Sequence, residues 1–399
     1  MIPSLIISVD GLNARFLGAY GNRWVPTPVL DALASRSVLF DSCFCETFDC
    51  HRNLLSVIVG QSPLLGLQQP VESVLPTPMV LITDDSEVAE KLSPYFEDVL
   101  WMPDARGEAV EPDSPREQLF EFAFAEISRR ESSGDLLPIW IHCKGMFGEW
   151  EAALETQEFF KDEGDTPPCR FSEVPAFQLG EEFDPDDRTL VVHGYAAEVV
   201  EFDRSLGQFL EILDQEIGRF DVSLFGTRGF PLGEHREIGN FGLSCYVEKF
   251  HVPCFVAKQG LKAPIRIPSM TGISELGKTL WHSELSKPGE EIDGARIIDW
   301  HPEGRQILTL QSSGFARIQT PAWSYIHPWV EGQQTVDEKR QGELFARRCD
   351  RLELNEVSAV CPEICTELRV ELARRVAAYA SRKSPGNLIL SDPIYTGIS

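Results

Sequence analysis

Four side chains close to residue 50 belong to types that bind metals or act as nucleophiles. They are Cys43, Cys45, Cys50 and His51. Thiolate and imidazole ligands suit Zn²⁺, but structural zinc sites usually combine two closely spaced ligand pairs. The spacing here lacks a second Cys-x-x-Cys or His-x₃-His half. We therefore favour ordinary buried thiols over a zinc site.

Carboxylates follow two of the apolar runs in the chain. Asp10-Gly11 interrupts the run Leu5–Val9, and Asp84-Asp85 follows Met79–Thr83. A strand that ends just before a capped helix explains the second pair more simply than a metal site does, and Ser86 is a plausible cap for that helix.

Composition limits the classes of partner. The 399 residues contain 62 acidic and 36 basic side chains, for a formal charge of −26. Binding to DNA, RNA or an anionic membrane rests on clustered Lys and Arg, so these partners are disfavoured. The N-terminus lacks the basic region of a secretory signal, and no apolar stretch approaches 18 residues. We expect a cytoplasmic protein whose ten cysteines are thiols.

Strand and helix patterns alternate along most of the chain. Short apolar runs typical of buried parallel strands occur at 5–9, 38–44, 79–83, 137–142, 222–225 and 251–256. Helical patterns lie between them at 28–34, 54–59, 114–130 and 192–213, the last with apolar residues three and four apart. The acidic, Pro- and Gly-rich segment 149–187 is expected to be an exposed excursion. These patterns predict an α/β fold with a mainly parallel sheet covered by helices on both faces.

The pattern of apolar and polar residues changes near residue 290. Short runs at 307–310, 316–319 and 323–326 predict a small antiparallel sheet, and a final helix is expected over 362–381. We therefore divide the chain into an α/β domain, 1–290, and a C-terminal subdomain, 291–399.

An ordered set of motifs resembles the sulfatases of the alkaline-phosphatase superfamily. The matching segments are 7–12, 17–22, 27–34, 40–42, 60–63, 140–142, 195–207, 232–235 and 248–253. Each piece is weak by itself, but together they cover nearly the whole chain in the family's order. The resemblance implies the sulfatase fold, with a calcium ion and a formylglycine nucleophile in active members.

The resemblance also shows which catalytic groups this chain has lost. Of the four metal-ligand positions, Asp10 keeps a carboxylate, whereas the others hold Gly11, Thr227 and Arg228. Calcium needs several hard oxygen ligands, and a guanidinium repels a cation. We therefore expect no metal and no other cofactor; calcium belongs only to the alternative of an active enzyme.

The nucleophile motif is also incomplete. Cys50 stands at the family's nucleophile position, but Arg52 and Leu54 replace the Pro and Arg that the modifying enzymes read. By counting along the motifs, Phe147 replaces the family's histidine, and Phe241 or Gly242 replaces its lysine. Conversion of Cys50 to formylglycine is not expected.

These losses favour a catalytically inactive, sulfatase-like protein that acts as a binding or regulatory module. The alternatives are a diverged hydrolase of sulfate or phosphate esters that uses Cys50 or Thr47, and a structural partner of an active sulfatase. We also predict that Arg228 pairs with Asp10 in place of the metal. A sharper hypothesis adds Arg52, Thr227 and the N-terminus of the helix after Cys50 as a binding site for a small sulfate or phosphate ester.

Overall fold

The computed structural model describes residues 4–66, 75, 78–103, 115–135, 137–171, 173–241, 244–261, 263–281, 308–337, 339–385 and 390–396. The predicted boundary between residues 290 and 291 lies outside these ranges, so that division of the chain stays a prediction. Among the described helices, none combines the length and apolarity that crossing a membrane requires.

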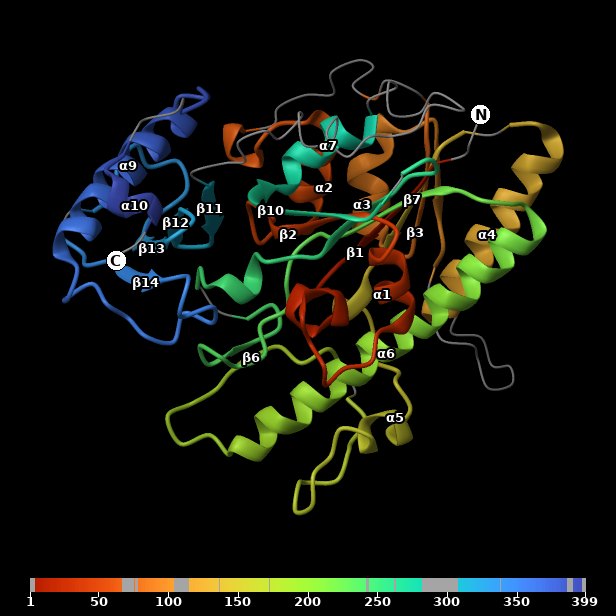
Figure 1. Cartoon of the computed structure of the whole chain (residues 1–399), viewed down its shortest axis with the longest axis horizontal. Helices are drawn as coiled ribbons and strands as arrows, with labels where there is room; N and C mark the ends of the chain where they lie inside the picture. Colours follow the sequence, from red (N-terminus) through yellow and green to blue (C-terminus); the bar gives the residue numbers. More distant parts are fainter. Residues whose placement is uncertain are drawn as a thin grey trace.

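An eight-stranded, mostly parallel sheet forms the centre of the molecule (Figure 1). The alternating pattern predicts such a sheet, but it contains no run for the strands at 98–101 and 265–272. Its strand order is β10-β2-β9-β7-β1-β5-β3-β4, and only β9 runs antiparallel to its neighbours. The strands are β1 (Ser4–Val9), β2 (Val38–Phe44), β3 (Val80–Thr83), β4 (Asp98–Trp101), β5 (Ile139–Cys143), β7 (Asp221–Gly226), β9 (Cys254–Ala257) and β10 (Ile265–Gly272).

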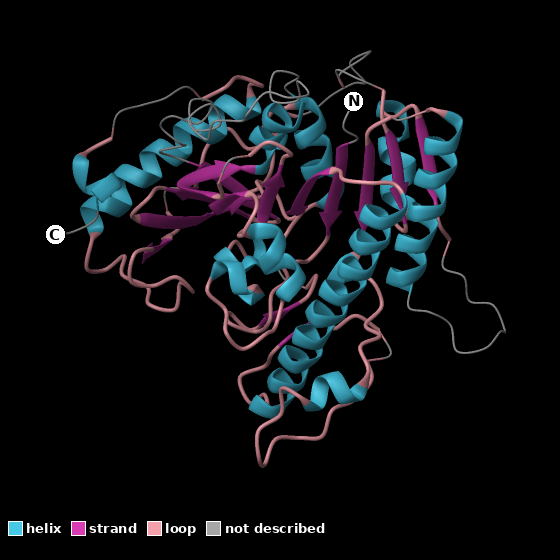
Figure 2. Cartoon of the chain, turned by 45° about the vertical axis from the view of Figure 1, so that its right-hand side comes forward, coloured by secondary structure: helices cyan, strands magenta, loops and turns pink. Residues whose placement is uncertain are grey.

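Helices cover both faces of this sheet (Figure 2) because its central strands carry apolar side chains on both sides. One face packs against α1 (Pro28–Ala34), α4 (Pro115–Ser133) and α6 (Pro185–Glu216). The opposite face packs against α2 (Cys50–Val59), α3 (Ser86–Leu92) and α7 (Ile273–Trp281). The sheet is therefore the middle layer of three, and the carboxyl ends of β1, β5 and β7 lie side by side at one edge.

A second sheet of four antiparallel strands lies beside the first (blue in Figure 1), as predicted. It comprises β11 (Leu308–Ser312), β12 (Phe315–Gln319), β13 (Trp323–Pro328) and β14 (Glu343–Ala346), followed by α9 (Pro362–Ala380) and α10 (Asp392–Thr396). The two sheets share a core, because Leu308, Leu310 and Phe345 pack into the same apolar cluster as β2 and α2.

Three local expectations need correction. Asp85, and not Ser86, caps α3, because its carboxylate accepts hydrogen bonds from the backbone N–H groups of Glu87 and Val88. Helix α6 begins at Pro185, seven residues before the predicted start, because Asp184 supplies a cap and Pro is suited to the first helical position.

The third correction concerns the predicted excursion at 149–187. It contains the short helix α5 (Leu154–Glu158), and β6 (Phe177–Gln178) pairs with β8 (Glu237–Ile238). Gln157, Phe160 and Leu179 are buried, so part of the segment packs beside the long helix α6.

Candidate functional site

The carboxyl edge of the main sheet brings Asp10 and Arg228 together. Strands β1 and β7 are parallel neighbours with Val9 opposite Gly226, so the residues that follow them meet. The guanidinium of Arg228 donates from Nε to both oxygens of Asp10, at 3.0 and 3.1 Å, and from Nη2 to Oδ2 at 2.9 Å. The hydroxyl of Thr227 donates to Oδ1 at 2.5 Å. The predicted ion pair between Asp10 and Arg228 is confirmed.

Aromatic rings enclose the guanidinium of Arg228. Its central carbon lies 4.0 Å from the ring centre of Phe147 and 5.1 Å from that of Phe48, and Nη1 donates to the carbonyl of Phe48. Burial by itself lowers the pKa of Arg228, but the adjacent Asp10 outweighs that effect and raises it. The group is a fixed cation at the place where the family resemblance puts a metal ion.

Gly11 leaves no room for a larger side chain beside Phe147. Its φ of +76° favours glycine, and a Cβ at this position would lie 3.0 Å from Cβ of Met146 and from the ring of Phe147. The carbonyl of Gly11 accepts a hydrogen bond from the hydroxyl of Tyr195 at 2.7 Å. A carboxylate side chain at position 11 would collide with Phe147, which stands where counting had placed the missing histidine.

Cys50 is the first residue of α2 and contacts His142 at the carboxyl end of β5. Its Sγ lies 3.7 Å from Nε2 of His142 and 3.6 Å from the hydroxyl of Thr227. The other ring nitrogen of His142 is 2.9 Å from the hydroxyl of Ser8, which also accepts a hydrogen bond from Trp140. Burial raises the pKa of the Cys50 thiol, and burial lowers the pKa of His142. Both groups are therefore neutral in the folded protein at neutral pH.

Arg52 does not join this site, which corrects the sharper hypothesis. Its guanidinium pairs with Glu331 at 3.1 Å and donates to the carbonyl of Pro63. The start of α2 is capped by Asp49, whose carboxylate accepts from the backbone N–H of Arg52 at 3.0 Å. Arg228 is held by Asp10 and the helix end by the carboxylate of Asp49, and an anion site at Arg228 and Thr227 stays a prediction.

Thr47, Cys45 and His51 each contact a neighbouring residue of the chain. The hydroxyl of Thr47 is buried and lies 2.9 Å from the amide oxygen of Asn53. Cys45 donates to the carbonyl of Lys249, and His51 contacts Asp49 at 3.1 Å. Within the part of the chain that the structure describes, no group of three or more His, Cys, Asp or Glu side chains converges on a metal position.

Lys249 is a site residue that the sequence analysis missed. Its ammonium is fully buried, pairs with Glu237 at 2.8 Å and lies 4.7 Å from the ring centre of Phe48. The ring of Phe48 thus contacts both Lys249 and Arg228. The sequence did contain a signal for this residue, because the lysine directly follows Glu248 in the resembling motif. We had instead aligned the family's lysine with Phe241 or Gly242. Phe241 is exposed, and Gly242 lies outside the described residues.

Several proteins of known structure share this architecture. The chain resembles the phosphonate monoester hydrolase of Agrobacterium radiobacter at a TM-score of 0.70 and 15% identity, over 96% of each chain. The 2-O GAG sulfatase BT1596 matches at 0.65 and 16% identity, over 98% of this chain and 95% of that one. BT4656, solved with its substrate D-glucosamine-2-N,6-O-disulfate, matches at 0.68 and 14% identity, over 96% and 99%.

One curated sequence also aligns with part of the chain. Iduronate 2-sulfatase of Mus musculus is 41% identical over 59 residues, which is 15% of this chain and 10% of that protein. No family model matches the chain. The fold is that of the sulfatases and phosphonate monoester hydrolases, as the motifs predicted.

The residues at the carboxyl edge do not fit the calcium ion that the resemblance implies. Asp10 is the one carboxylate among the four ligand positions, and its oxygens are engaged by Arg228 and Thr227. A cation placed there would meet a guanidinium at contact distance, with Phe147 closing the open side. The charge of Arg228 and the geometry of Gly11 both oppose a divalent ion.

Proposed function

We propose that this chain is a sulfatase-fold protein that does not hydrolyse esters and that acts as a binding or regulatory module. The observation that carries the proposal is the ion pair between Asp10 and Arg228. A buried carboxylate without a counter-charge costs several kcal/mol. The guanidinium provides that charge in a planar, two-pronged geometry that suits a carboxylate.

The nucleophile position supports the same proposal. Cys50 lies in a site where burial raises the pKa of its thiol, so the nucleophilic thiolate is disfavoured. Its neighbours Arg52 and Leu54 do not match the motif that resembling enzymes need for maturation. Because the ligand positions do not suit a metal, no divalent ion at this edge would neutralise the charge of an ester substrate.

Elemental analysis and turnover assays test the proposal. We expect less than stoichiometric calcium, magnesium and zinc in the purified protein, and no hydrolysis of aryl sulfates or aryl phosphates above background. Mass spectrometry of the peptide that carries Cys50 should show an unmodified cysteine. One metal per chain that disappears in Asp10→Ala, or turnover that disappears in Cys50→Ser, would overturn the proposal.

One contact favours a second candidate function, a hydrolase with a thiol nucleophile. The Cys50 Sγ and His142 Nε2 atoms lie 3.7 Å apart, and Ser8 holds the opposite side of the imidazole. A cysteine with a positioned histidine is the usual nucleophile–base pair of thiol hydrolases. Turnover lost in both Cys50→Ser and His142→Gln, with no metal requirement, would establish this alternative. A third candidate function is that of a structural partner of an active sulfatase, and only the fold supports it.

A further inference from the structure

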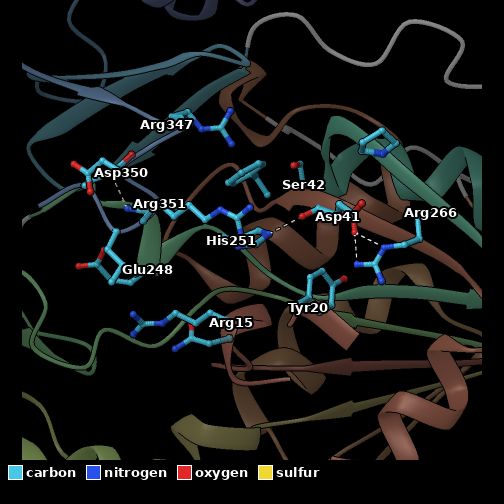
Figure 3. A pocket seen from close by; sticks show the side chains of 16 residues that line it. Arg15, Tyr20, Asp41, Ser42, Glu248, His251, Arg266, Arg347, Asp350 and Arg351 are labelled. Carbon is cyan, nitrogen blue, oxygen red and sulfur yellow. Dashed lines mark hydrogen bonds and ion pairs between the residues drawn. The ribbon is translucent and has the colours of Figure 1, made fainter. Parts of the chain in front are cut away.

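A second candidate site lies in a cavity between the two sheets, away from Asp10 and Cys50. The cavity has a volume of about 640 Å³, within the range of roughly 300–1,000 Å³ typical of small-molecule pockets. Its walls come from the loop after β1, from β2, from the segment before β9, from β10 and from the turn after β14. Figure 3 shows Arg347 and Arg351 reaching into this space beside Ser42 and His251.

The carboxylates of the cavity wall already have partners. Asp41 pairs with Arg266 at 2.5 Å, and Glu353 pairs with Arg317 at 2.6 Å. Asp350 accepts two backbone hydrogen bonds, at 2.9 and 2.7 Å.

Glu248 uses only one of its carboxylate oxygens. Oε1 contacts Nδ1 of His235 at 2.8 Å, whereas the buried Oε2 has no hydrogen-bond partner among the described residues. The buried Nε of Arg15 likewise lacks one, although the same guanidinium pairs with Glu234 through Nη2. Arg15 Nε needs an acceptor and Glu248 Oε2 needs a donor, so a molecule that completed this wall would have to offer both, an anionic group for Arg15 and a hydroxyl or N–H group for Glu248.

Two arginines of the cavity lack a counter-charge. Arg347 donates to the carbonyl of Thr320 at 2.6 Å and contacts the sulfur of Met270, and both acceptors are neutral. Burial and the neighbouring Arg317 outweigh the attraction of Glu353 and lower the pKa of Arg347 to about 10. Arg351 is exposed, and within the described residues no carboxylate lies at ion-pair distance from either guanidinium.

We propose that this cavity binds a small phosphate monoester through Arg347 and Arg351. Two uncompensated guanidinium groups carry two positive charges, and a phosphate monoester carries about −1.5 to −2 at pH 7. A sulfate monoester carries a single negative charge and therefore matches the pair less well. Phe44, Leu352 and Pro268 provide apolar wall for the organic part of the ligand.

This inference deepens the proposed function, because it gives the binding module a ligand class and a site. It also holds if the proposed loss of hydrolysis is wrong, since none of Asp10, Cys50 and Arg228 lines the cavity. Four arginines and four carboxylates line the cavity, so the attraction of an anion rests on Arg347 and Arg351, which have no carboxylate at ion-pair distance among the described residues, and not on a net positive charge.

Calorimetry with phenyl phosphate, phenyl sulfate, inorganic phosphate and inorganic sulfate tests the inference. We expect phenyl phosphate to bind more tightly than phenyl sulfate at pH 7.5. Its affinity should fall as the pH drops below the second phosphate pKa of about 6, while that of phenyl sulfate should change less. No binding of any probe at millimolar concentration would overturn the inference and leave the proposed loss of hydrolysis untouched.

Variants locate the site. Arg351→Met should weaken phenyl phosphate binding about tenfold or more, since a charge-assisted hydrogen bond is lost. Arg347→Met should act in the same direction, and the exposed Arg351 provides a variant that does not disturb the core. Arg348→Met is the matched control, because this exposed neighbour changes the net charge equally and does not line the cavity.

The outcomes separate the two proposals. An equal loss in Arg348→Met would show a general charge effect and overturn the inference. Binding that persists in Arg347→Met and Arg351→Met but disappears in Arg228→Met would place the ligand at the carboxyl edge and also overturn it. Hydrolysis of phenyl phosphate by a protein whose binding still requires Arg351 would instead overturn the proposed function and keep the inference.

Discussion

Asp10 is a buried carboxylate whose charge is balanced by side chains of its own chain. It is 3% exposed and receives hydrogen bonds from Arg228 and Thr227. In a low-dielectric site, such a group needs a counter-charge of some kind, either a metal ion or a cationic side chain. Arg228 is long enough to reach it from the adjacent strand end and planar enough to bind both oxygens.

Removing one member of this pair should be costly. We expect Arg228→Met to lower the free energy of unfolding by about 3–5 kcal/mol, because Asp10 is left buried and unpaired. The double variant Asp10→Asn with Arg228→Met should recover part of that loss, because it removes the orphan charge as well. Urea denaturation of the wild type, the two single variants and the double variant measures the coupling. A change below about 0.5 kcal/mol in Arg228→Met would contradict the role of the pair.

At the scale of elements, one histidine joins three segments that are far apart in the chain. His235 lies just before β8, contacts Glu248 before β9 at 2.8 Å, and contacts the carbonyl of Glu353 after β14 at 2.8 Å. Its ring stacks on Tyr246 with the ring centres 3.5 Å apart. These contacts fix the turn that carries Arg351 relative to the main sheet.

The stability that His235 provides should depend on pH. Burial by itself lowers its pKa, but the carboxylate of Glu248 outweighs that effect and raises it above the unfolded value of about 6.5. The charged contact is therefore fully present below pH 6.5 and is lost as the pH rises through the raised pKa. We expect His235→Gln to destabilise the protein more at pH 6 than at pH 8.5, as measured by urea denaturation at both values.

His251→Gln is a control of opposite sign. Burial lowers the pKa of His251 to about 4. Between about pH 4 and 6.5, this histidine is therefore protonated in the unfolded chain and neutral in the folded protein. The difference in stability between wild type and His251→Gln should therefore shrink as the pH falls. The same pH trend in both variants would contradict the assigned charge states.

At the scale of the whole molecule, the smaller sheet shares one part of its core with the main sheet and packs the other part against α9 in a cluster of its own. Leu308, Leu310 and Phe345 are buried against residues of β2, α2 and α7, and Thr47 forms a backbone bridge with Gln311. Buried apolar surface stabilises by about 25 cal/mol per Å², so the larger sheet loses cover when the smaller one is removed. The two sheets are expected to unfold together.

Truncation tests this cooperation. A fragment of residues 1–281 should bind a hydrophobic dye and lose the cooperative unfolding transition, whereas the full chain should unfold in a single transition. The full chain with Leu310→Ala should keep that transition at a stability lower by about 2–5 kcal/mol, the usual cost of truncating a buried leucine. A fragment that unfolds cooperatively and binds no dye would show that the larger sheet folds by itself.

Local patterns in the sequence were enough for most elements and for one contact. Apolar runs of four to seven residues separated by amphipathic segments predicted the strands and helices, because backbone hydrogen bonding imposes periods of about 2 and 3.6 residues. Asp10 and Arg228 were expected to meet because both follow strands that the resemblance places at one edge of the sheet. That contact depends on backbone topology and little on side-chain conformation.

Side-chain directions and contacts between distant segments were decided by the tertiary structure. Arg52 turns to Glu331 and away from Arg228, and Cys50 meets His142, because each side chain adopts the rotamer that its neighbours in space allow. The cavity of Arg15, Arg347 and Arg351 joins the two ends of the chain. The spacing of these residues in the sequence does not predict such a site, because the arginines become neighbours only when the smaller sheet packs against the larger one.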